Sequence, residues 1–330
     1  MLSSPTRSVL LLLTAGAAIV LSRMAPAAES TAAAASTGSS AAVAMHQDGT
    51  SMLVTSGDRT LMEYRLVASS AKPYVRRLYT PAGVNVLRDE VPDHKHHHGL
   101  MFAIAADGVN FWEETPGTGR EVPQGGSRAS TSAANGTARA SLGQDLAWIG
   151  PKSPLPILLE HRTVVVGRTK DGSATLLTWR STLSAPPERV SVKLTGNCYF
   201  GLGMRFLASM VKGGRFFFSA DKKEATIVHG DQQVTPARWS AYTASAEGKP
   251  VTVAIFQGPV NARFPSPIFT MLTPFSYQSA TLNLWKEPLV LKPGQPLDLR
   301  YGVALWDGQT DPAAVEALYQ QWVAGEAAGK

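Results

Sequence analysis

Cysteine is nearly absent from the sequence. Cys198 is the one cysteine among 330 residues, so no disulfide can form within the chain. Its neighbours Asn197 and Tyr199 offer no base that would activate a thiol, and we interpret Cys198 as a buried structural residue. Without covalent cross-links, the fold must be stabilised by a hydrophobic core.

Other absences exclude whole classes of protein. The sequence has no run of about five or six lysines and arginines, so its net charge of +6 does not indicate a nucleic-acid partner. No glycine-rich phosphate loop follows a predicted strand, and no CxxC pair is present. These absences argue against nucleotide-binding and zinc-finger proteins, and we expect no cofactor.

The N-terminal segment has the pattern of a signal peptide. Arg7 precedes an apolar stretch at residues 9–21, and Ala25-Pro26-Ala27 supplies small residues of the kind that a signal peptidase recognises. A membrane anchor is the alternative, but spanning a bilayer takes about 20 apolar residues. We therefore predict a signal peptide at residues 1–27 and export to the bacterial periplasm or beyond, with no stable membrane span after cleavage. Residues 28–50, rich in alanine and serine, are expected to be a disordered lead-in.

The rest of the chain reads as strands. Short runs rich in β-branched and aromatic residues alternate with turn signals, and the Asp-Gly pair at 171–172 predicts a hairpin. Helix signals are confined to residues 311–322, where Asp311 can cap the start and Val315, Leu318 and Trp322 share a face. We predict one all-β domain at residues 51–330: a large antiparallel β-sandwich with one short C-terminal helix.

Four of the seven histidines lie together in Asp93-His94-Lys95-His96-His97-His98-Gly99. On an extended backbone, alternate side chains share a face, so His94, His96 and His98 would point one way and His97 the other. Imidazoles beside a carboxylate can act as general acid and base near neutral pH or bind sugar hydroxyl groups. A metal site with Asp93, Glu113 or Glu114 is a second reading, although the HxHHH spacing matches no strong metal signature. In a third reading, the histidines only stabilise a turn.

Two further segments carry candidate residues. Trp112, next to Glu113 and Glu114, could stack on a sugar ring while a carboxylate accepts its hydroxyl groups, or Trp112 could belong to the core. Arg205 follows two glycines that let a ligand approach closely. Elsewhere, Glu160 and Arg162 share a strand face, and we expect an ion pair on the sheet surface.

The segments around the histidines resemble a known family. Lys72-Pro73-Tyr74, Leu78-Tyr79-Thr80-Pro81-Ala82-Gly83, Pro92 to Leu100 and Val109-Asn110-Phe111-Trp112-Glu113-Glu114 occur in this order. Together they resemble the exported bacterial "PmoA family protein", a domain of unknown function related to the galactose-mutarotase-like supersandwich. The label suggests a methane monooxygenase subunit, which is an integral membrane protein and does not fit a chain without a series of membrane spans.

The resemblance implies site residues by motif. It implies catalytic roles for Asp93, His94, His96, His97 and Glu114, and substrate-binding roles for Lys72, Tyr74, Trp112 and Arg205. His98 is weakened as a candidate because the family varies there. The sequence departs from the family pattern in three places: Lys72 replaces an arginine, Asn110 runs directly into Phe111, and Ile268-Phe269 replaces a Trp-His pair.

These observations predict an exported carbohydrate-active protein. It would be an enzyme that acts on a saccharide or modified sugar through histidine and carboxylate groups, by hydrolysis, lyase chemistry or epimerisation. The alternatives are a non-catalytic glycan-binding module and a metal-dependent enzyme that uses the histidine cluster. The expected partner is a small molecule or oligosaccharide, with no nucleic acid.

Overall fold

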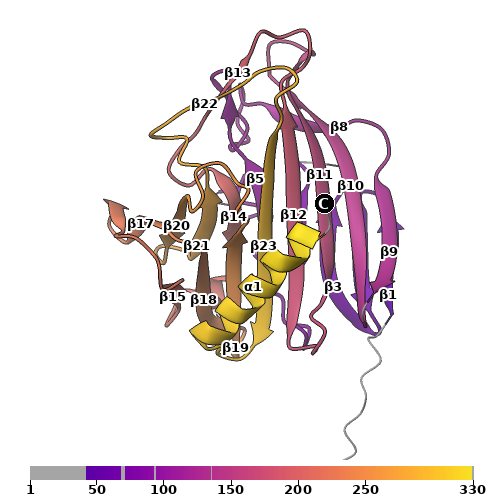
Figure 1. The fold of residues 1–330 in the computed structure, drawn as a ribbon, viewed down its shortest axis with the longest axis vertical. Helices are drawn as coiled ribbons and strands as arrows, with labels where there is room; N and C mark the ends of the chain where they lie inside the picture. Colours follow the sequence, from indigo (N-terminus) through magenta and orange to yellow (C-terminus); the bar gives the residue numbers. More distant parts are fainter. Residues whose placement is uncertain (1–41, 68–70, 93, 135, 329–330) are drawn as a thin grey trace, which may run out of the picture. The chain divides into compact units, whose positions relative to one another are not determined.

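Antiparallel sheets dominate the fold (Figure 1). The computed structural model describes residues 42–67, 71–92, 94–134 and 136–328. These residues fall in one compact unit, Ser39–Lys330. The predicted fold class, an antiparallel β-sandwich with one C-terminal helix, is confirmed.

The first sheet contains ten strands. In spatial order they are β1 (Val43–Asp48), β2 (Ser51–Ser56), β3 (Arg59–Arg65), β4 (Tyr74–Leu78), β5 (Leu100–Ala103), β14 (Gly201–Arg205), β21 (Tyr277–Thr281), β20 (Pro267–Met271), β17 (Gln232–Pro236) and β16 (Thr226–His229). Strands that are far apart in sequence therefore become neighbours, and β5 pairs with β14. The first strand begins inside the expected disordered segment 28–50, so the ordered chain starts earlier than predicted.

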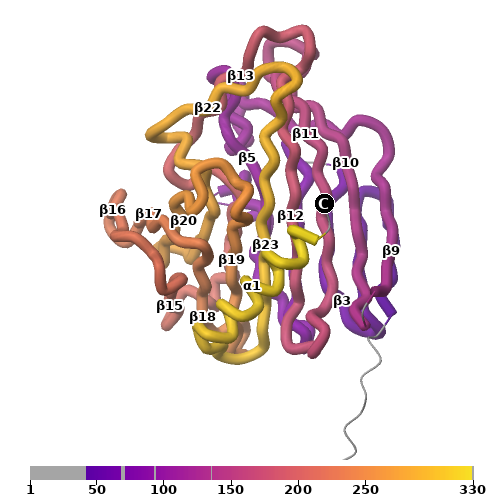
Figure 2. Tube along the Cα trace, in the orientation of Figure 1, coloured from indigo at the N-terminus to yellow at the C-terminus, as the bar shows by residue number. Residues whose placement is uncertain are grey.

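The second sheet contains nine strands and faces the first. Its order is β15 (Arg215–Phe218), β18 (Trp239–Ala246), β19 (Lys249–Gln257), β23 (Leu297–Asp307), β12 (Ala174–Ser184), β11 (Pro156–Arg168), β10 (Thr137–Ile149) and β8 (Arg120–Pro123), with β9 (Arg128–Ala134) also paired to β10. The trace in Figure 2 follows β10, β11, β12 and β23 side by side. The predicted hairpin is confirmed: β11 and β12 are joined through Gly172, whose φ of 70° suits glycine.

Smaller elements complete the described part of the chain. A four-stranded sheet contains β22 (Leu289–Leu291), β13 (Val192–Thr195), β6 (Ala105–Ala106) and β7 (Val109–Asn110). A short 3₁₀ helix, η1, spans Ala208–Met210, and the helix α1 spans Pro312–Ala328. Among the described residues, no helix is long and apolar enough to cross a membrane.

The hydrophobic core lies between the two large sheets. Side chains from both sheets form one cluster, in which Tyr64 of β3 and Trp179 of β12 lie with ring centroids 6.5 Å apart. The helix α1 covers the outer face of the second sheet (Figure 1). Its buried residues include Val315, Leu318 and Trp322, as the sequence predicts, and the Asp311 side chain accepts a hydrogen bond from the N–H of Ala313.

A charged group lies inside this core. Arg162 of β11 contacts the carboxyl groups of Glu160 and Glu121, each at 2.8 Å. The predicted pair of Glu160 and Arg162 is confirmed, but its expected place on the sheet surface is wrong, because the two side chains are only 2% and 1% exposed. The strand turns this face inward, where Trp179 lies under the guanidinium group.

Candidate functional site

The histidine-rich segment is a turn between β4 and β5. The N–H of His94 donates to the carbonyl of Val91, and the N–H of His97 donates to the carbonyl of His94. The alternation expected for an extended backbone is therefore wrong. Because the chain turns, residues three apart come together, and the rings of His94 and His97 stack with centroids 4.7 Å apart. His96 packs edge-on against both rings, and His98 faces another set of partners.

Gly99 allows the turn to enter the sheet. A Cβ atom at this position would lie 2.5 Å from the carbonyl oxygen of Val75 and 2.7 Å from that of Arg76. These backbone atoms cannot move aside without disturbing β4. Glycine therefore lets the chain pass close to β4 before β5 begins and fixes the three histidines at the start of β5, an interior strand of the first sheet.

The turn forms one wall of a pocket of about 310 Å³, here called the histidine pocket. Its lining residues are His94, His96, His97, Glu113, Tyr199, Gln232, Phe269, Met271, Phe275 and Tyr277. The opposite walls come from the neighbouring strands β17, β20 and β21 and the connection between β20 and β21. Aromatic rings and hydrogen-bonding groups thus face the same space, as is typical of small-molecule sites.

Arg205 sets the protonation state of His97. The Nη1 of Arg205 lies 3.0 Å from the Nδ1 of His97, and its guanidinium carbon lies 3.3 Å from the ring centre of Phe275. A guanidinium group can only donate, so Nδ1 must accept, and His97 is a neutral imidazole with its proton on Nε2. The sequence prediction for Arg205 is thereby refined, because this residue orients His97 and is itself buried.

His96 is also neutral at pH 7. Burial lowers the pKa of its imidazole to about 4, and the nearby positive charges of Lys72, His94 and His98 act in the same direction. A neutral imidazole can accept a proton or a hydrogen bond from a sugar hydroxyl group. The pocket therefore offers a free-base imidazole beside a second neutral imidazole that can donate.

Behind the pocket, His98 joins two carboxylates. Its Nδ1 lies 3.0 Å from Asp89, its Nε2 lies 2.8 Å from Glu114, and Lys72 donates to the same Glu114 oxygen at 2.8 Å. Tyr74 stacks on the His98 ring, with centroids 4.1 Å apart, and donates to Asp89. We call these five residues the His98 clamp.

The His98 clamp contains an imidazolium ion. Burial by itself would lower the pKa of His98, but the hydrogen bonds to Asp89 and Glu114 outweigh it and raise that pKa. Burial opposes ionisation of Glu114, yet His98 and Lys72 lower its pKa to about 2; the pKa of Asp89 is lowered in the same way by His98, Tyr74 and Arg76. Two ionised carboxylates can only accept, so both nitrogens of His98 donate.

The predicted site residues are thus divided between two places. His94, His96 and His97 line the pocket. Glu114, Lys72 and Tyr74 belong to the clamp, and Trp112 is fully buried, stacked on Phe200 with centroids 5.1 Å apart. Asp93 lies outside the described residues.

Several site residues were not predicted from the sequence. Asp89 of the clamp and the aromatic residues of the pocket were not expected; Glu113 was considered only as a metal ligand or as a neighbour of Trp112, and His98 was weakened as a candidate by the resemblance. Asp89 stands in Leu87-Arg88-Asp89-Glu90, which has no motif that would single it out. Phe269, at a position where the resemblance implies a histidine, supplies an apolar wall.

Within the described ranges, no group of three or more His, Cys, Asp or Glu side chains has the arrangement of a metal site. The stacked rings of His94 and His97 lie nearly parallel, at 19°, so their nitrogens do not converge on one point.

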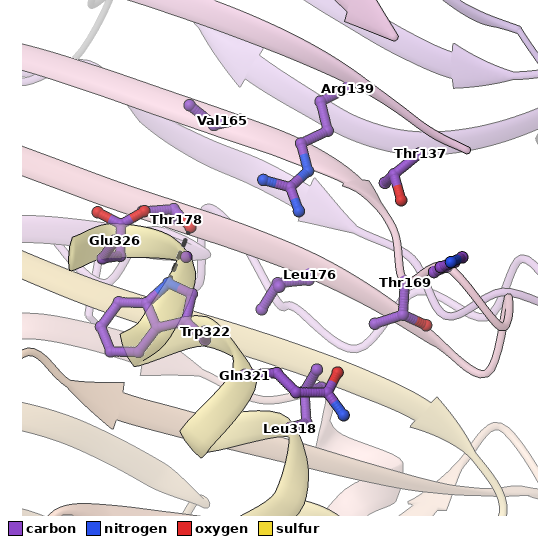
Figure 3. A pocket seen from close by; sticks show the side chains of 12 residues that line it. Thr137, Arg139, Val165, Thr169, Leu176, Thr178, Leu318, Gln321, Trp322 and Glu326 are labelled. Atoms are coloured by element: carbon purple, nitrogen blue, oxygen red, sulfur yellow. Dashed lines mark hydrogen bonds between the residues drawn. The ribbon is translucent and has the colours of Figure 1, made fainter. Parts of the chain in front are cut away.

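A separate hollow of about 240 Å³ lies between α1 and the outer face of the second sheet (Figure 3). In it, Trp322 donates to the hydroxyl of Thr178 at 3.0 Å, beside Leu176 and Val165. Glu326 at its rim is paired with Arg180. These contacts hold the helix on the sheet, and we assign the hollow no chemistry.

Replacing Arg205 with methionine is expected to let the Nδ1 of His97 take up a proton at acidic pH. In the unaltered protein, nitrogen-15 NMR should show His97 with an unprotonated Nδ1 between about pH 5 and 8, because the guanidinium occupies that lone pair. In Arg205→Met, protonation of Nδ1 should become detectable at the acidic end, while the exposed His46 should be unchanged. A protonated Nδ1 in the unaltered protein would contradict the assignment.

Comparisons with known proteins identify the family to which the chain belongs. Residues 51–320 match the model of a family of unknown function, DUF6807, and no curated protein matches the chain. A domain of unknown function was expected, but the match gives no support to the name PmoA.

Among solved structures, the chain is similar to a galactose mutarotase-like protein of Clostridium acetobutylicum, with 9% identity and a TM-score of 0.46 over 82% of this chain and 100% of the other. It is also similar to the GH36 α-galactosidase AgaB of Geobacillus stearothermophilus, with 10% identity and a TM-score of 0.45 over 81% of this chain and 41% of the other. A galactose mutarotase related enzyme of Lactobacillus acidophilus matches with 7% identity and a TM-score of 0.37 over 81% and 98%. Scores this low carry no argument about what the chain does.

Proposed function

The chain belongs to the DUF6807 family of unknown function, and we propose that it is a carbohydrate-active enzyme whose saccharide or modified-sugar substrate binds in the histidine pocket. One observation carries the proposal: three imidazoles, a carboxylate and four aromatic rings line a single pocket of about 310 Å³.

The lining suits a sugar in two ways. The rings of Tyr199, Phe269, Phe275 and Tyr277 can stack on the CH face of a pyranose, and His94, His96, Gln232 and Glu113 can bond its hydroxyl groups. A site for a purely apolar ligand would not need this number of hydrogen-bonding groups, each of which loses water on binding.

The protonation states favour proton removal over protonation of a leaving group. His96 is a free base and His97 is a neutral donor, so neither is an acid at neutral pH. Hydrolysis of glycosides commonly uses two carboxylates across the scissile bond, whereas the described lining includes one, Glu113. Lyase or epimerase chemistry fits better: His96 or Glu113 would take a proton from the substrate, and the Nε2–H of His97 would donate to an oxygen that gains charge.

A non-catalytic glycan-binding module is the second candidate. The part-buried carboxylates Asp89 and Glu114 are held by His98, which leaves them unable to accept a substrate proton readily. Aromatic stacking and hydrogen bonds from the same pocket would then give binding without turnover.

His96→Ala is the test of this pocket. A panel of neutral oligosaccharides, uronate-containing oligosaccharides and keto-sugars would be assayed for turnover and binding with the unaltered protein, His96→Ala and the control His46→Ala. We expect turnover of at least one class by the unaltered protein and a loss of about 100-fold or more in His96→Ala. His46 is exposed on β1, so its variant should remain fully active.

The outcomes separate the candidates. Binding without turnover by the unaltered protein would support the glycan-binding module. Equal turnover by His96→Ala and the unaltered protein would remove the histidine pocket as the active site. Export of the protein, which the N-terminal segment indicates, forms part of the proposal and would be checked by fractionation of cells that produce the full chain.

A further inference from the structure

A second pocket, of about 490 Å³, shares no lining residue with the histidine pocket. We call it the arginine pocket. It lies between β4, the segment at residues 79–89 and the turn that joins β18 to β19. Its charged lining residues are Arg76, Arg77, Arg88, Asp89, Glu247 and Lys249.

A β-bulge places two consecutive arginines on the same side of β4. Glu63 pairs with Arg77 and Tyr64 pairs with Val75, so Arg76 is an extra residue in the strand. In a regular strand, Arg76 and Arg77 would point to opposite faces, whereas here both line the pocket. Bulges commonly redirect a side chain toward a functional position.

Arg76 is held in place by two carboxylates, and Arg77 lies near one of them. Arg76 donates to Glu63 at 3.0 Å and to Asp89 at 3.1 Å, and the Nε of Arg77 lies 3.8 Å from the other Glu63 oxygen. Glu63 and Asp89 therefore orient the Arg76 guanidinium group and leave further N–H donors on it, whereas Arg77 is about half exposed and only approaches Glu63. Preorganised donors of this kind bind an anion with little further loss of side-chain freedom.

Arg88 supplies a further cation at the same pocket. Its backbone is fixed by a hydrogen bond from its N–H to the carbonyl of Arg205, and its side chain is half-buried. The Arg88 side chain makes no hydrogen bond or ion pair with another described side chain. Lys249 adds another positive charge, so four cations and two carboxylates line the pocket, and Asp89 is already engaged by His98 and Tyr74.

We propose that the arginine pocket is a binding site for an oxyanion group (carboxylate, sulfate or phosphate) carried by a small polar molecule. Guanidinium groups bind such anions in a fork of two parallel N–H donors, which lysine cannot offer. The pocket volume accommodates more than the anionic group itself, so an acidic sugar is within its range.

Calorimetric titration of the purified full chain tests the site. The probes are inorganic sulfate, inorganic phosphate and glucuronate, with glucose as the uncharged counterpart of glucuronate, all at one ionic strength. We expect saturable binding of at least one anion and none of glucose. Arg88→Ala should weaken that binding about 10-fold or more, whereas Arg215→Ala, an exposed arginine on β15, should not.

The variants also separate this site from the histidine pocket. His96→Ala is expected to bind the anion normally, because His96 does not line the arginine pocket. Binding of glucuronate alone would identify an acidic sugar as the ligand, and binding of all three anions would identify the oxyanion group itself. The proposal is overturned if no anion binds saturably, if Arg215→Ala weakens binding as much as Arg88→Ala, or if only His96→Ala abolishes it.

Discussion

Replacing Glu121 with glutamine is expected to stabilise the protein at alkaline pH and to flatten its stability profile. Burial raises the pKa of the Glu121 carboxyl to about 8; Arg162 opposes this shift, and the charge of Glu160 adds to it. Among the described residues, Glu160 accepts from Nε and Nη2 of Arg162 and from Trp148 and Ser181, whereas Glu121 accepts from Arg162 alone. One cation thus faces two carboxyl groups, and the proton resides on Glu121.

The direction of the pH dependence follows from this raised pKa. Between about pH 4.5 and 8, native Glu121 holds a proton that the unfolded chain has released, so folding takes up a proton. Its stabilising contribution is complete below about pH 4.5 and is lost as the pH rises to 8. At about 1.4 kcal/mol per pH unit, the loss over this interval amounts to about 4–5 kcal/mol.

Urea unfolding at pH 5, 6, 7 and 8 checks this expectation. Glu121→Gln keeps the neutral shape, so its free energy of unfolding should decline less steeply with pH than that of the unaltered protein, by about 1.4 kcal/mol per pH unit. Glu224→Gln, an exposed position, is the matched control and should retain the profile of the unaltered protein. An unchanged slope in Glu121→Gln would show that Glu121 is ionised in the fold.

Replacing His98 with glutamine is expected to be the most destabilising change in the turn. The variant loses the positive charge between Asp89 and Glu114, and leaves two carboxylates facing a neutral side chain. Glu114 keeps its contact with Lys72, and Asp89 keeps its contact with Arg76. We therefore expect a cost below the value for an uncompensated buried charge, about 3–5 kcal/mol, and above the value for an exposed pair, about 1 kcal/mol. Because the pKa of His98 is raised, its contribution is complete below about pH 6.5 and is lost as the pH rises through the folded-state value.

The loss should therefore be largest at pH 5–6 and smaller at alkaline pH. His161→Gln is a matched control, because His161 also pairs with a carboxylate, at 2.7 Å from Asp145, but both side chains are about half exposed. Such a pair contributes about 1 kcal/mol or less. Unfolding curves in which His98→Gln and His161→Gln lose equal stability would contradict an imidazolium at His98.

Much of the architecture could be predicted because it depends on local pattern. Runs of β-branched residues and the Asp-Gly turn identified the hairpin of β11 and β12, and the period of Val315, Leu318 and Trp322 identified the covering helix. The strand at Val43–Asp48 was missed, since its composition merges with the alanine-rich segment before it. It is ordered because it pairs with β2, a contact outside its own sequence.

The sequence could predict which segment carries the site, but not how its side chains are arranged. Counting histidines located the segment, and the motif resemblance selected His94, His96 and His97, which line the pocket. Which ring faces which partner depends on two backbone hydrogen bonds inside the turn, and on residues such as Phe275 and Tyr277 that are far away in the chain. Neighbouring carboxylates illustrate the same point: Glu113 lines the pocket and Glu114 binds His98.

The turn at residues 91–98 has a consequence for comparing sequences of this kind. His97 and His98 are adjacent in sequence, yet His97 stacks on His94 and His98 lies between Asp89 and Glu114. Insertion of one residue between His94 and His97 would separate the stacked rings even if every histidine were kept, whereas a change at the exposed Lys95 would leave them in place. In an alignment of this segment, the spacing between the histidines therefore says more about whether the stacked pair is kept than the number of histidines does.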